Sequence, residues 1–189
     1  MTSPQQTYTA EYMAAFDRTE SFGLKAPRRV LVRKDCIDPT FALAAALKYF
    51  DSHSSFERTR MPVQTNADFL AIFWQEAQVP LELTFGVVDV GGKTYGECSD
   101  ATIRRYLRDK DLAWQREGVP FRVWLTSPAC EVLDVTFAMV TSQTREQCAK
   151  RIIYKPVSAS HLSTPVYHPR IVGVDFLEQT GALFDPEVV

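Results

Sequence analysis

Residues 121–126 read Phe-Arg-Val-Trp-Leu-Thr, and residues 131–140 read Glu-Val-Leu-Asp-Val-Thr-Phe-Ala-Met-Val. Both stretches are rich in β-branched and aromatic side chains, which favour strands. The segment Ser127-Pro128-Ala129-Cys130 between them contains a proline, which is typical of turns. The pattern predicts a β-hairpin, and this hairpin decides the fold class because it gives the second half of the chain an antiparallel sheet.

The expected register of this hairpin brings two charged residues together. If residues 127–129 form the loop, Thr126 pairs with Cys130, and counting back along both strands sets Arg122 opposite Asp134. Directly opposed residues have Cβ atoms about 4.5–5.5 Å apart and project from the same face. The sequence therefore predicts a guanidinium–carboxylate pair between these two residues.

A second hairpin is predicted upstream of the first. Residues 81–90 have the composition of a strand, and Gly91-Gly92 is typical of a two-residue turn that leads back into residues 93–96. Shorter strands are expected at residues 29–33 and, at a sheet edge, at residues 171–176. Together these segments predict one antiparallel sheet.

Helical patterns occupy much of the first half of the chain. Residues 40–50 are nearly apolar all round, which predicts a central, buried helix packed on the sheet. Asp38 or Cys36 can cap this helix, with Pro39 inside its first turn in either case. Four other helices are expected. They are residues 9–18 with Tyr12, Ala15 and Phe16 inward, 67–78 capped by Asn66 with Phe69, Leu70, Phe73 and Trp74 buried, a helix capped by Ser99 or Asp100 that runs to about Arg108, and 143–152.

The order of elements predicts one α+β domain over residues 1–189. It comprises a mainly helical half (1–80), an antiparallel sheet (81–140), and a helix with a wrapping C-terminal segment (141–189). Residues 51–65 are polar and irregular, which indicates a loop. With 46% hydrophobic and 23% charged residues, the chain has the composition of a packed globular domain.

Composition and charge exclude several classes of function. The net charge of −2 argues against general binding of nucleic acid. We expect a cytoplasmic protein without a membrane segment, because no apolar run reaches bilayer length and the first residues lack a signal-peptide pattern. The cysteines lack the spacing of a zinc site, and nucleotide-binding glycine motifs are absent, so no metal or cofactor is expected.

One order of residues points to chemistry. Cys36 precedes the helix at 40–50, and far downstream two strands carry Val123-Trp124-Leu125 and Leu133-Asp134-Val135-Thr136. In this order the chain resembles the papain-like superfamily, and in particular its transglutaminase-like branch. The resemblance covers residues 30–140 and implies a cysteine nucleophile, a histidine that acts as acid and base, and an aspartate that orients the histidine.

The resemblance assigns the nucleophile to Cys36 and the orienting carboxylate to Asp134. The position where the family has its histidine, two residues before Trp124, holds Arg122, which cannot shuttle a proton. A histidine must then come from elsewhere. The chain contains His53, His161 and His168, all in segments expected to be loops, and chain order favours His161 and His168.

Two functions of different class follow from this pattern. The first is acyl transfer or amide hydrolysis through a thioester on Cys36, with an acyl or amide small molecule or a protein as substrate, and with Cys98 as the second candidate nucleophile. The alternative is a catalytically inactive papain-like protein that binds a protein or a small ligand, with Arg122 and Trp124 as binding residues. A third interpretation is a small ligand-binding α+β cone in which Cys36 has no role.

Overall fold

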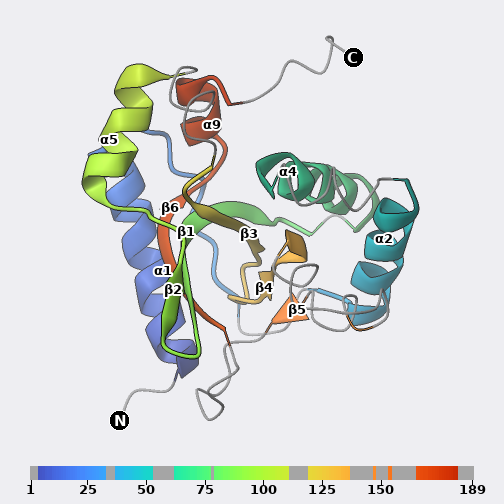
Figure 1. Cartoon of the computed structure of the whole chain (residues 1–189). Coiled ribbons are helices and arrows are strands. Elements are labelled where there is room, and N and C mark those ends of the chain that lie inside the picture. The colour runs from blue at the N-terminus through green and yellow to red at the C-terminus, as the bar shows by residue number, and fades with distance from the viewer. Residues whose placement is uncertain are drawn as a thin grey trace.

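The computed structural model describes residues 4–32, 37–52, 62–77, 79–110, 119–136, 147, 153–154 and 165–182. Within these ranges it shows a mixed α+β arrangement in which helices cover both faces of an antiparallel sheet (Figure 1). The helices are α1 (Pro4–Ser21), α2 (Pro39–Ser52), α4 (Pro62–Ile72), the π-helical turn η1 (Phe73–Ala77), α5 (Asp100–Asp109) and α9 (Asp175–Thr180). The strands are β1 (Glu82–Val90), β2 (Lys93–Tyr95), β3 (Arg122–Thr126), β4 (Val132–Leu133), β5 (Ile153–Tyr154) and β6 (Val166–Val172).

Strand β1 is the centre of the sheet. It pairs antiparallel with β3 in the register Glu82↔Thr126 and Gly86↔Arg122, and its other edge pairs antiparallel with β6. The far end of β1 turns through Gly91 and Gly92 into β2, and both glycines have positive φ angles, as a tight two-residue hairpin requires. The predicted sheet with strands at 81–90 and 121–126 and the glycine turn are thus confirmed.

The two faces of the sheet bury different side chains. One face packs against α1, where Tyr8, Tyr12 and Phe16 meet Trp124 and Tyr167. The other face packs against α4, α5 and α9 around a larger apolar cluster. Alternating residues of β1 and β3 therefore serve two cores, which explains why these strands read as nearly continuous apolar runs.

The helix predicted at 40–50 is present as α2, but the prediction that it is central and packed on the sheet is wrong. In α2, Ala42, Ala45 and Tyr49 are buried, whereas Leu47 and Lys48 are exposed. The helix packs on α4 and η1 through the edge-to-face pairs Tyr49–Phe69 and Phe41–Phe73, and it lies at the edge of the structure rather than on the sheet (Figure 1). Ala44 is on the exposed side of this helix, and a small exposed apolar side chain carries little penalty.

The hairpin between β3 and β4 also differs from the prediction. Leu125 pairs with Leu133 and Thr126 with Val132, so the connection contains five residues, 127–131, and Cys130 adopts a positive φ of 59°. This register would set Arg122 opposite residue 136 rather than Asp134. The strand ends at Leu133, and residues 135–136 are already helical. Residues 137–140 lie outside the described ranges.

Other boundaries shift because tertiary contacts override local pattern. Residues 29–32 form no strand, although the amide of Val32 donates to the carbonyl of Pro128. The expected loop at 51–65 is too long, since α2 continues to Ser52 and α4 begins at Pro62. Asn66 therefore lies inside a helix, and Trp74 is 53% exposed instead of buried. The late strand, β6, comes earlier than predicted, and α9 begins at Asp175.

Two of the remaining helix predictions are confirmed, whereas the predicted helix at 143–152 lies outside the described residues except for residue 147. Helix α1 contains the expected inward stripe of Tyr12, Ala15 and Phe16, and α5 begins after Ser99, whose hydroxyl caps the amide of Thr102. The described helices include none that is long and apolar enough to cross a membrane.

Candidate functional site

Three of the predicted site residues, Arg122, Trp124 and Asp134, lie around Tyr167 beneath α1. The Tyr167 hydroxyl donates to Asp134 Oδ2 at 3.2 Å, and its ring lies 5.0 Å from that of Trp124 in an edge-to-face contact. Burial raises the pKa of Tyr167 well above its ordinary value, and the negative charge of Asp134 adds to the rise while Arg122 opposes it. The cluster is sealed from solvent, because Asp134, Trp124 and Tyr167 are all less than 5% exposed.

The predicted pair between Arg122 and Asp134 does not form. Besides Tyr167, the Asp134 carboxylate accepts a hydrogen bond from the Thr136 hydroxyl at 2.9 Å. Arg122 Nε is buried without a hydrogen-bond partner in the part of the chain that the structure describes. The shifted hairpin register explains the difference, since it removes the direct opposition of the two residues. Trp124 is likewise a core residue, and its indole N–H donates to Tyr8 Oη at 3.0 Å.

Asp38 caps α2, which decides between the two caps considered from the sequence. Its carboxylate accepts from the amides of Thr40 at 2.8 Å and Phe41 at 3.4 Å. Cys36 and His161 lie outside the described residues, as does His53. The residue that follows Cys36, Ile37, is buried, and its amide donates to Glu131 Oε2 at 3.1 Å in the turn between β3 and β4.

Cys98, the second candidate nucleophile, lacks an activating environment. It precedes α5, but its side chain is buried, and burial raises its pKa to about 12. Arg170 and Arg18 lower that pKa only in part. At neutral pH Cys98 is therefore a thiol rather than a nucleophilic thiolate.

His168 lies in strand β6, not in a loop, and it is held between two carboxylates. Its Nδ1 is 2.9 Å from Glu11 Oε2 on α1, and its Nε2 is 3.3 Å from Asp89 Oδ2 on β1. The hydrogen bond with Glu11 raises the pKa of His168 above its ordinary value, the charge of Asp89 adds to the rise, and partial burial opposes it. We call Glu11, His168 and Asp89 the histidine clamp. Asp134 is not part of it.

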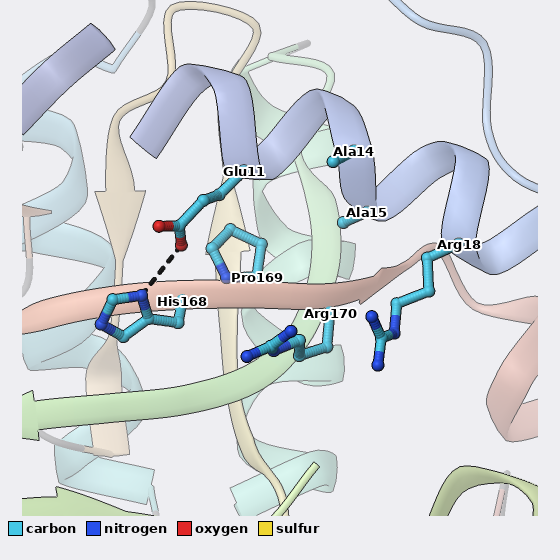
Figure 2. Close-up of a pocket in the computed structure, with 7 residues that line it drawn as sticks. All are labelled: Glu11, Ala14, Ala15, Arg18, His168, Pro169 and Arg170. Atoms are coloured by element: carbon cyan, nitrogen blue, oxygen red, sulfur yellow. Dashed lines mark hydrogen bonds and ion pairs between the residues drawn. The ribbon is translucent and has the colours of Figure 1, made fainter. Parts of the chain in front are cut away.

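The histidine clamp borders a pocket between α1 and β6. The pocket has a volume of about 240 Å³, and its walls are two short stretches of chain that are about 150 residues apart in sequence. Its lining residues are Glu11, Ala14, Ala15 and Arg18 of α1 with His168, Pro169 and Arg170 of β6 (Figure 2). Helix α1 presents its four lining residues along one stripe, at spacings of three, four and seven residues.

The two ends of this pocket differ in charge. Figure 2 shows Glu11 and His168 at one end, Arg18 at the other end, and the Arg170 side chain between them. Arg18 Nη2 pairs with Asp100, while Arg18 Nε is buried and has no hydrogen-bond partner among the described residues. Within the same residues Arg170 forms no salt bridge. We call Arg18 and Arg170 the arginine pair.

Sequence reasoning missed this site for two reasons. His168 and Arg170 flank Pro169, and a proline argues against a strand except at a sheet edge, which is where β6 lies in the described sheet. The polar stripe of α1 was the available signal, since Glu11 and Arg18 share a helix face with two alanines. No local pattern connects that stripe to residues 168–170.

Glu82 gives a testable pH dependence. Burial beside α1 raises its pKa to about 7 from an ordinary 4.5. As pH rises from about 4.5 to 7, the unfolded chain releases this proton before the folded chain does, so the free energy of unfolding falls. After discounting for partial exposure, we expect Glu82→Gln to be about 1–2 kcal/mol more stable than wild type at pH 8, and nearly equal to it at pH 5.

Urea denaturation at pH 5 and pH 8 measures this effect. Glu178→Gln, at an exposed position of α9, serves as the matched control and should follow the wild-type pH dependence. An identical pH dependence of stability in wild type and Glu82→Gln would contradict the assignment.

No family model, curated protein or solved structure matches this chain.

Proposed function

We propose that the chain is a binding module for a small oxyanion, a phosphate or carboxylate group, which it holds in the pocket between α1 and β6. The observation that carries the proposal is the arginine pair, two guanidinium groups from different elements that line one pocket. Guanidinium groups match phosphate and carboxylate oxygens in geometry and remain charged at all physiological pH values.

The unused hydrogen-bonding capacity of the pocket supports this function. A buried donor without a partner is destabilising, and Arg18 Nε is such a donor in the described structure. A bound oxyanion would accept from it and would also neutralise the charge of Arg170. The volume of about 240 Å³ indicates a compact ligand, since pockets for larger small molecules are about 300–1,000 Å³.

Titration calorimetry with inorganic phosphate tests the proposal. We expect Arg170→Gln to weaken binding by about tenfold or more, because a hydrogen bond to a charged group contributes about 1.5–3 kcal/mol. Arg108→Gln is the matched control, since Arg108 lies exposed on α5 outside the pocket and pairs with Asp109. Equal affinity in wild type and Arg170→Gln, or no binding by wild type, would reject the proposed function.

A second candidate is cysteine-dependent acyl transfer on a papain-like fold, with Cys36 as nucleophile. The supporting observation is that Ile37 is bonded to Glu131, which brings the residue next to Cys36 to the turn of the hairpin that leads to Asp134. His161 stays a candidate acid and base for this function.

The pH profile of thiol alkylation tests the second candidate. An activated Cys36 should be alkylated with a pH midpoint below 7, whereas Cys98 should react only at alkaline pH because burial raises its pKa. Iodoacetamide labelling followed by peptide mass spectrometry resolves each cysteine. A midpoint for Cys36 near the ordinary thiol value of about 8.5 would contradict a catalytic role.

A further inference from the structure

The histidine clamp lies at one end of the pocket, and its charge depends on a single proton. Both ring nitrogens of His168 face a carboxylate oxygen, Glu11 at 2.9 Å and Asp89 at 3.3 Å. A neutral imidazole has one N–H and one lone pair, so it can satisfy only one of these contacts, whereas an imidazolium donates to both. The geometry therefore fits the protonated ring.

We propose that protonation of His168 controls the affinity of the α1–β6 pocket for its anion. This inference rests on the proposed function and adds a regulatory device to the same site. With His168 protonated, the histidine clamp carries a net charge of −1, and after loss of the proton it carries −2. Because Glu11 and His168 both line the pocket, the additional negative charge repels a bound anion.

The groups that face His168 come from each element packed against it. Helix α1 supplies Glu11 and, further along the pocket, Arg18, while β1 supplies Asp89. Strand β6 itself supplies Arg170. The Asp89 carboxylate is fixed in turn by the Thr94 hydroxyl of β2 at 2.5 Å. Of the side-chain types in this set, imidazole is the one that ordinarily changes its charge near neutral pH, so we assign the proton-dependent charge to His168.

Deprotonation also weakens a structural link. The contact between Glu11 and His168 joins α1 to β6, the two walls of the pocket. A neutral His168 can donate to only one of Glu11 and Asp89. The attraction between α1 and β6 is therefore reduced when His168 loses its proton. Both effects lower anion affinity as pH rises through the raised pKa of His168.

Sulfate is the appropriate probe because it keeps its charge of −2 over the whole range, unlike phosphate. Calorimetric titration of the full chain at pH 6 and pH 9 should show an affinity at least threefold lower at pH 9. His168→Gln should bind sulfate with the same affinity at both pH values. This variant retains Glu82, whose pKa burial raises to about 7. A pH dependence that came from Glu82 would therefore persist in His168→Gln, whereas one that comes from His168 would be lost.

A second measurement uses only the wild-type protein. Because coupling between two ligands is reciprocal, saturating sulfate should raise the pKa of His168 by about half a unit or more, as measured by NMR of the imidazole carbon. If sulfate binding requires Arg170 yet has one affinity at both pH values and leaves the His168 pKa unchanged, the regulatory inference is overturned and the binding function stands. If sulfate does not bind at either pH, the proposed function fails with it.

Discussion

Replacement of Trp124 by alanine is expected to lower the free energy of unfolding by about 3–5 kcal/mol, the range for large buried aromatic side chains. Trp124 is fully buried between the sheet and α1, where its ring contacts Tyr167. Its removal leaves a large cavity and also removes the N–H that donates to the Tyr8 hydroxyl. That hydroxyl in turn bonds Thr126 Oγ1 at 2.8 Å, so the link between α1 and β3 weakens.

Trp74 provides the matched control for this experiment. It is 53% exposed in η1, so Trp74→Ala should cost less than about 1 kcal/mol. Chemical denaturation at pH 7 measures both variants. Equal destabilisation by the two substitutions would contradict the burial of Trp124 between the sheet and α1.

The second large effect is expected at Gly86, where β1 meets both β3 and β6. A Cβ atom at this position would overlap the carbonyl oxygen of His168 and lie 2.7 Å from Cη2 of Trp124. The first obstacle is backbone, so it cannot move aside without disturbing the pairing of β1 with β6. We expect Gly86→Ala to destabilise the fold by about 3 kcal/mol, at the upper end of the range for overpacking.

Gly92→Ala is the control for the steric overlap at Gly86, because it introduces a Cβ atom at a glycine where there is no overlap. A Cβ at Gly92 meets open space, and only its φ of 77° is unfavourable, so the expected loss is about 1–2 kcal/mol. Thermal and urea unfolding of both variants distinguish the cases. A smaller loss at Gly86 than at Gly92 would mean that β6 does not lie against β1 in the register described.

The features predicted correctly from sequence are those that local chemistry determines. Gly91 and Gly92 specify a tight turn because few other residues adopt two successive positive φ angles. Ser99 specifies the start of α5 because its side chain satisfies a free amide of the first turn. The apolar strands β1 and β3 were recognisable because both of their faces are buried.

The incorrect predictions concern choices that tertiary contacts make. The register of the β3–β4 hairpin depends on the positive φ of Cys130 and on the buried Glu131, whose carboxylate accepts from both Ser127 and Ile37. No rule for turn residues contains that contact. The position of α2 similarly depends on aromatic pairs with residues of α4 and η1, which the apolar pattern of α2 alone cannot specify.

The candidate site also depends on tertiary contacts that local sequence patterns do not specify. His168 was among the predicted catalytic residues, and its actual partners, Glu11 and Asp89, come from α1 and β1 rather than from the hairpin. Asp134 and Trp124 belong to a buried cluster instead. The pocket exists only because β6 returns to the side of α1, and its arginine pair combines residues 18 and 170 of the chain.

An amide NMR titration with inorganic phosphate shows whether an oxyanion binds between α1 and β6. We expect saturable shifts with a single dissociation constant, largest at residues 14–18 and 168–170, and their loss in Arg170→Gln. Shifts confined to the exposed arginines of α5, or shifts at the pocket that persist unchanged in Arg170→Gln, would contradict oxyanion binding at this site.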